Sequence, residues 1–211
     1  MPTADTLDSV DPQALYDTGM EFARFGDHIR AAQYLMLAWD RGYDPNKVVP
    51  KLIRMYTKAS RFRDAIQTAE RRLGQDPLDA NLRLVLATLY LSVQEKRKAY
   101  AEASAAVRVL PDDPRAHYLM AILEREANTN AEAARTHYAR YLELAPAGPH
   151  ANEARAFVEN PPEEPLPTND GGAPVPVRVP APAPTVSPDE MLPPESPEHD
   201  EATHGSNEVR P

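Results

Sequence analysis

Two consecutive segments of this chain, 46–79 and 80–113, have the same length of 34 residues and match each other at several positions. The matching pairs are Tyr56 with Tyr90, Ala65 with Ala99, Ala69 with Ala103, and Pro77 with Pro111. A repeat of this period is typical of helical hairpins that stack into an array. A single hairpin cannot bury its own apolar face, so its neighbours must complete the core. The repeat therefore predicts an all-helical, elongated protein.

The pattern extends to both sides with small shifts in length. An end hairpin needs a lid because its outer face would otherwise meet water, and a segment of helical character follows the last unit. We expect four repeats, a capping helix and flanking regions at these positions: a disordered lead-in at 1–11, a folded domain at 12–160 with repeats at about 12–45, 46–79, 80–113 and 114–147, and a capping helix at 148–159.

Turn and capping residues predict where the first helices begin. Asp11 precedes Pro12, which is the combination expected for an N-cap followed by the first helical residue. Asn46 is the predicted cap of the second unit. Small residues recur where the two helices of a hairpin must approach closely, and these are Ala32, Ala65, Ala99 and Ala134, together with Ala38, Ala69 and Ala103.

These residues resemble the tetratricopeptide repeat family. Its pattern has an aromatic residue at the eleventh position of a unit, alanine at the twentieth and proline at the thirty-second, which Tyr56, Ala65 and Pro77 match. Ile53 departs from it at the usually small eighth position, and Glu124 departs at the aromatic position of the fourth unit. The resemblance implies a right-handed superhelical solenoid of about four hairpins with a C-terminal capping helix.

The resemblance also implies a binding groove, because arrays of this family use the concave face formed by the first helices. Carrying those positions onto this sequence gives the partner-binding candidates Tyr16, Met20, Arg24, Lys47, Lys51, Arg54, Lys58, Asn81, Leu84, Thr88, Leu91, Arg115, Tyr118, Ile122 and Arg125.

Two features stand out among these candidates. A row of cations, Lys47, Lys51, Arg54 and Lys58, repeats every three or four residues and therefore shares one helix face. Beside it an apolar strip is expected, made of Leu84, Leu91, Tyr118 and Ile122. The cations are either a contact surface or a solvated helix face, and the strip is either a contact surface or part of the core.

We expect a non-enzymatic adaptor that binds an extended or helical, partly acidic segment of a partner protein. A secretion-type or assembly chaperone is an alternative of the same class. A nucleic-acid-binding module that uses Lys47–Lys58 is an alternative of a different class, although a net charge of −9 disfavours it. Without a phosphate-binding glycine loop, a nucleophile elbow or a clustered set of metal ligands, the sequence predicts no catalytic residue, no cofactor and no metal.

The cysteine count and the hydropathy of the chain exclude further kinds of protein. The chain has no cysteine, which excludes disulfides and thiolate chemistry. No apolar run is long enough for a membrane-spanning helix, and the N-terminus does not resemble a signal peptide, so we expect a cytoplasmic protein. Arginine exceeds lysine, which is typical of GC-rich bacterial coding sequences.

The last segment, 161–211, differs from the rest in composition. It contains 14 prolines, ten acidic residues and two basic residues, so its net charge is −8. Such a segment has too few apolar residues to fold by burial, and we expect it to be disordered. We expect this segment to be a linker, a docking motif, or an internal competitor that binds the groove of the same molecule. Binding is suggested by two apolar residues, Met191 and Leu192, that follow acidic ones.

Overall fold

The computed structural model describes residues 11–126, 130–160 and 187–188. The remaining residues, which include most of the tail, lie outside the described part of the chain. Nine helices follow one another within those ranges, at α2 (Pro12–Arg24), α3 (His28–Asp40), α4 (Pro45–Lys58), α5 (Phe62–Gln75), α6 (Ala80–Ser92), α7 (Lys96–Val109), α8 (Pro114–Glu126), α9 (Ala131–Leu144) and α10 (Ala151–Glu159).

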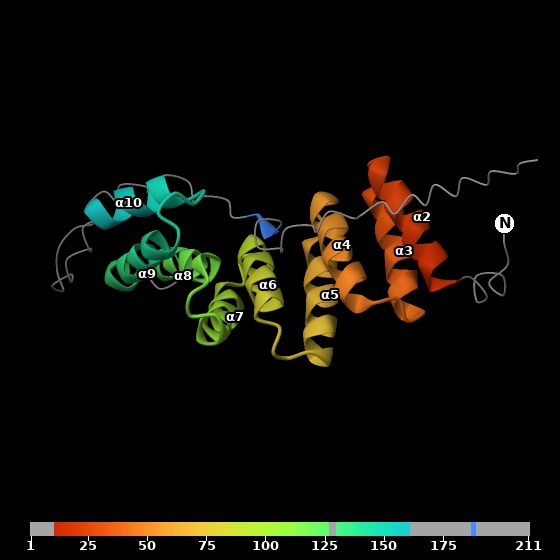
Figure 1. Cartoon of the computed structure of the whole chain (residues 1–211), viewed down its shortest axis with the longest axis horizontal. Helices are drawn as coiled ribbons and strands as arrows, with labels where there is room; N and C mark the ends of the chain where they lie inside the picture. The colour runs from red at the N-terminus through yellow and green to blue at the C-terminus, as the bar shows by residue number, and fades with distance from the viewer. Residues whose placement is uncertain (1–10, 127–129, 161–186, 189–211) are drawn as a thin grey trace, which may run out of the picture.

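The helices pack as hairpins in chain order, as Figure 1 shows from α2 and α3 at one end to α9 and α10 at the other. Each helix contacts the one before it and the one after it, and α6 also contacts α8. Helix α10 packs on α9 and closes the array. This arrangement confirms the all-α solenoid of about four hairpins with a capping helix.

Small side chains permit the close approach of the helices within each hairpin. Ala32, Ala65, Ala99 and Ala134 occur near the starts of α3, α5, α7 and α9, and each is at most 1 % exposed. Larger side chains fill the spaces that remain, such as Leu35 against Gly19. A Cβ added to Gly19 would lie 2.9 Å from Cγ of Leu35, so the second helix of the first hairpin needs a glycine opposite it.

The helix starts agree in part with the sequence interpretation. Asp11 is the N-cap of α2 and Pro12 its first residue, although the Asp11 side chain makes no capping hydrogen bond. The prediction that Asn46 caps α4 is wrong. The cap is Asp44, whose side chain accepts from the backbone N–H of Asn46 at 2.9 Å. Pro45 favours the earlier start because proline suits the first helical position.

The turns inside the first three hairpins share a left-handed residue. Gly26, Ser60 and Gln94 have φ angles of 77°, 57° and 64°, and they are spaced by one repeat length. Only glycine adopts this backbone region without a steric cost. The second and third units therefore use a strained residue where the first unit uses glycine.

Candidate functional site

The predicted basic row lies along one side of α4. Lys47 and Lys58 are exposed, whereas Lys51 and Arg54 are half-buried. Lys51 and Arg54 each have an interaction partner. The opposite side of α4 carries Val48, Leu52 and other core residues, which fix the direction in which the cations point. The row is therefore a surface of the array rather than part of its core.

A hollow of about 170 Å³ lies between the first turns of α4 and α6. Its lining combines apolar side chains with a few polar ones, and it is formed by Pro45, Asn46, Val49, Pro50, Ile53, Arg72, Asp79, Asn81, Leu82 and Val85. Pro50 lies inside α4, where it lacks the backbone N–H that would bond to the carbonyl of Asn46, and it lines this hollow. Lys47, the first cation of the basic row, directly follows Asn46, which lines the hollow.

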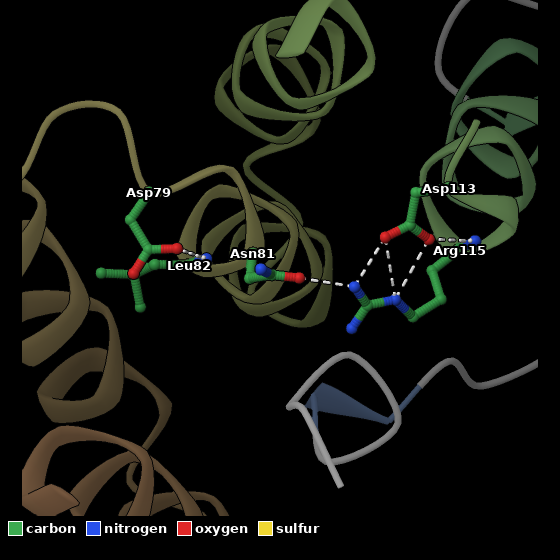
Figure 2. A network of polar contacts seen from close by, with 5 residues as sticks. All are labelled: Asp79, Asn81, Leu82, Asp113 and Arg115. Atoms are coloured by element: carbon green, nitrogen blue, oxygen red, sulfur yellow. Dashed lines mark hydrogen bonds and ion pairs between the residues drawn. The ribbon is translucent and has the colours of Figure 1, made fainter. Parts of the chain in front are cut away.

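Asn81 and Arg115 meet at the edge of this surface, as Figure 2 shows. Nη2 of Arg115 donates to Oδ1 of Asn81 at 2.5 Å, and the same guanidinium binds Asp113 at 2.6 Å. Burial of the Asp113 carboxyl opposes its ionisation, but Arg115 and backbone N–H groups outweigh this effect and lower its pKa. Asp79 at the start of α6 caps the helix by accepting from N–H of Leu82 at 2.9 Å. The two residues that sequence spacing placed at equivalent points of successive units are thus in contact.

The predicted apolar strip is not an exposed surface. Leu84, Tyr118 and Ile122 are at most 1 % exposed and belong to the hydrophobic core, and Thr88 is also buried. Leu91 is half-buried and packs against the core. Of the two alternatives for this strip, a contact surface or part of the core, the burial favours the core, because apolar side chains on the concave side pack against neighbouring segments instead of staying in water.

The burial of Tyr118 has a visible cause. Its ring stacks on the His150 ring, with centroids 3.8 Å apart, and its hydroxyl donates to Glu153 at 2.6 Å. Both partners belong to the capping segment, which thus covers this part of α8. Burial and the hydrogen bond to Glu153 raise the pKa of Tyr118 far above its usual value. Tyr118 is therefore a neutral donor at physiological pH.

Arg125 also binds the capping segment. Its guanidinium donates to Glu153 at 3.0 Å and to Glu126 at 3.1 Å. Both ion pairs are partly shielded from water, since the Arg125 side chain is 24 % exposed. Arg125 thus has a structural role in joining α8 to α10.

The three candidates of the first hairpin differ in accessibility. Tyr16 is buried, and its ring stacks on Tyr43 with centroids 4.4 Å apart. Met20 is half-buried against the core, and Arg24 is exposed at the end of α2. Arg24 is the accessible cation among them.

A histidine pair on α8 and α9 was missed in the sequence, where His117 and His137 appear as scattered residues. Their Nδ1 atoms are 3.0 Å apart, and Nε2 of His117 lies 2.9 Å from the carbonyl oxygen of Pro111. His117 donates to that carbonyl, so its Nδ1 accepts from His137. Burial and the nearby His117 lower the pKa of His137. Over the described ranges, no group of three or more metal-ligating side chains accompanies this pair.

Residues 56–123 match the family model of the tetratricopeptide repeat. The resemblance of this chain to the tetratricopeptide repeat family is confirmed. The fold is that of a protein–protein interaction scaffold. No curated protein matches the sequence.

Several solved tetratricopeptide repeat structures are similar to the array. One is YrrB, described as having an unusual peptide-binding site, with 16 % identity over 68 % of this chain and 74 % of that one, at a TM-score of 0.59. A second, from Parabacteroides merdae ATCC 43184, has 18 % identity over 70 % of this chain and 59 % of that one, at a TM-score of 0.61. A third is the MamA protein, with 18 % identity over 70 % of this chain and 84 % of that one, at a TM-score of 0.58. At these identities the likeness establishes the repeat fold alone.

The repeat helices are all short. In the part of the chain that the structure describes, no helix combines the length and the apolarity that a candidate membrane span requires.

Proposed function

We propose that this repeat protein is a non-enzymatic adaptor that holds a segment of a partner protein against α4 and α6. The carrying observation is that α4 bears the basic row and also lines a hollow of about 170 Å³ at the starts of these two helices. Cations attract acidic side chains of a partner, and the hollow accepts one or two apolar side chains. A partly acidic segment with an apolar residue near its end suits both features.

Three further observations support this proposal. The helices present their basic side chains from a rigid scaffold, which reduces the entropy lost on binding. The similar protein YrrB is described as having a peptide-binding site. The strip that sequence reasoning assigned to the partner is core, so the contact surface is restricted to Lys47, Lys51, Arg54 and Lys58, the hollow, and Asn81.

Binding through such a surface has a characteristic salt dependence. Lys47 and Lys58 are exposed, so their attraction for a partner is screened over about 8 Å at physiological ionic strength. Lys51 and Arg54 are half-buried and are screened less. Added salt should therefore slow association more than it speeds dissociation.

The test is affinity capture with the full chain and with the triple variant Lys51→Glu, Arg54→Glu, Lys58→Glu. A matched control reverses three exposed arginines on second helices of the hairpins, Arg63→Glu, Arg97→Glu and Arg108→Glu. Both variants change the net charge by −6, so a general effect of charge would appear in both. Proteins held by the wild type and the control, but lost from the first variant, are the partners that the proposal requires.

Three results would count against this function. Equal capture by all three proteins would place binding on another surface. Loss of all binding after nuclease treatment would favour the nucleic-acid alternative. Lys58→Glu, at the exposed C-terminal end of the row, is tested alone because the triple variant could lose helicity, and unchanged capture by this single variant would also count against the function.

A further inference from the structure

Beyond Asn160 the structure describes one short segment, Ser187 and Pro188. Pro188 is buried and Ser187 is half-buried, and Ser187 has an interaction partner. A proline of an acidic, proline-rich region becomes buried only when it packs against other parts of the molecule. Figures 1 and 2 both show this segment, in blue, beside α6, and Figure 2 shows it near the Arg115 side chain.

The burial of α6 indicates that another segment covers the side of this helix that faces the groove. Leu84 and Thr88 occupy the fifth and ninth positions of the third unit, which face the concave side in the tetratricopeptide repeat pattern, and both are 0 % exposed. Helix α6 also packs on α5, α7 and α8. The Ser187–Pro188 segment, which lies beside α6, is a neighbour that can cover this side.

The charges around this place are complementary. The sequence continues after Pro188 with Asp189 and Glu190. The cations on the groove side are Lys51 and Arg54 of α4 and Arg115 of α8, and all three have interaction partners. The two acidic residues that follow the buried proline in the sequence are therefore opposite in charge to these cations.

We propose that Ser187–Pro188 and the acidic pair that follows occupy the groove of the same molecule as an internal competitor. An external partner then binds by displacing this segment, and its own binding residues share the same chemistry: a proline followed by acidic side chains. The inference rests on the groove proposed above as the binding surface and names the kind of segment that fits it.

The chain between α10 and this segment is long enough for the arrangement. Residues 161–186 connect them, and a flexible chain of that length has a root-mean-square span of about 30 Å. A tether of this kind gives the segment a local concentration on the order of 1 mM. A weak segment with a Kd of about 0.1 mM would then lower the affinity of an external competitor by about tenfold.

The experiment measures binding of a fluorescent peptide of residues 184–194 to the full-length protein by anisotropy. We expect the variant Asp189→Lys, Glu190→Lys to bind this peptide about tenfold more tightly than the wild type, because its own segment no longer competes. The matched control is Asp200→Lys, Glu201→Lys, which changes the same residue types and the same charge elsewhere in the tail. It should bind like the wild type.

A second pair of changes tests the groove itself. Adding Lys51→Glu and Arg54→Glu to the variant Asp189→Lys, Glu190→Lys should abolish binding of the peptide. Equal affinity of the wild type and the two tail variants would overturn the inference, as would a dimer in light scattering, which would place the segment on a second copy. If the capture experiment succeeds while this one fails, the adaptor function stands and the internal competitor does not.

Discussion

Glu153 joins the capping helix α10 to both helices of the last hairpin, and its removal should loosen that end of the array. The carboxylate accepts hydrogen bonds from Tyr118 at 2.6 Å, from Tyr138 at 3.2 Å and from Arg125 at 3.0 Å. In Glu153→Ala, the hydroxyl of Tyr118 stays buried without this acceptor, and Arg125 keeps Glu126 as a partner.

The size of the effect follows from these contacts. A hydrogen bond to a charged group contributes about 1.5–3 kcal/mol, and the contributions of one shared acceptor do not add fully. The Glu153 side chain is 29 % exposed, so water partly replaces the lost contacts. We expect Glu153→Ala to lower the free energy of unfolding by about 3 kcal/mol and Glu153→Gln by about half as much.

Urea unfolding followed by circular dichroism measures this change, and hydrogen exchange locates it. Helix α10 has nine residues, which is too short for an isolated helix to be stable in water. Its amides should therefore exchange faster in the variant before the amides of α4 and α5 do. The matched control is Glu159→Ala, an exposed acid of the same helix. If both variants lose less than about 0.5 kcal/mol, as surface substitutions do, Glu153 does not anchor the cap.

Two further predictions concern the histidine pair and the hairpin turns. The folded-state pKa of His137 is lowered below 6.5, so its neutral form favours the fold and stability should fall as pH decreases from about 6.5 towards that lowered value. His137→Gln should remove this part of the pH profile in urea unfolding, and an unchanged profile would contradict the assignment. Ser60→Gly and Gln94→Gly should each raise the melting temperature, because relief of a left-handed residue is worth about 1 kcal/mol. Gly26→Ala at the equivalent position should lower it, and a decrease in both Ser60→Gly and Gln94→Gly would show that the turns at Ser60 and Gln94 carry no strain.

The fold was predictable because the same packing residues recur at the same positions in several units. Tyr56 and Tyr90, or Ala65 and Ala99, each identify the same packing position, so an error in one unit is corrected by the next. The start of α4 was placed too late because two capping residues, Asp44 and Asn46, flank Pro45. Which of two such residues caps a helix depends on whose side chain reaches a free backbone N–H group.

The candidate site was harder to predict, for a physical reason. A repeat position fixes the side of a helix from which a side chain projects, but it does not tell whether a distant segment covers that side. Tyr118 is covered by His150 and Glu153, which lie outside the repeats. The contact between His117 and His137 also depends on the crossing of α8 and α9, which sequence spacing does not determine.

The contact between Arg115 and Asn81 has a mechanical consequence. Solenoids bend by small changes in the rotation between neighbouring units. The Arg115 side chain bridges two successive first helices at the edge of the groove and is itself held by Asp113, so it works as a strut across one joint. A ligand that grips α4 and α6 together would stiffen the preceding joint, which this contact between α6 and α8 does not span.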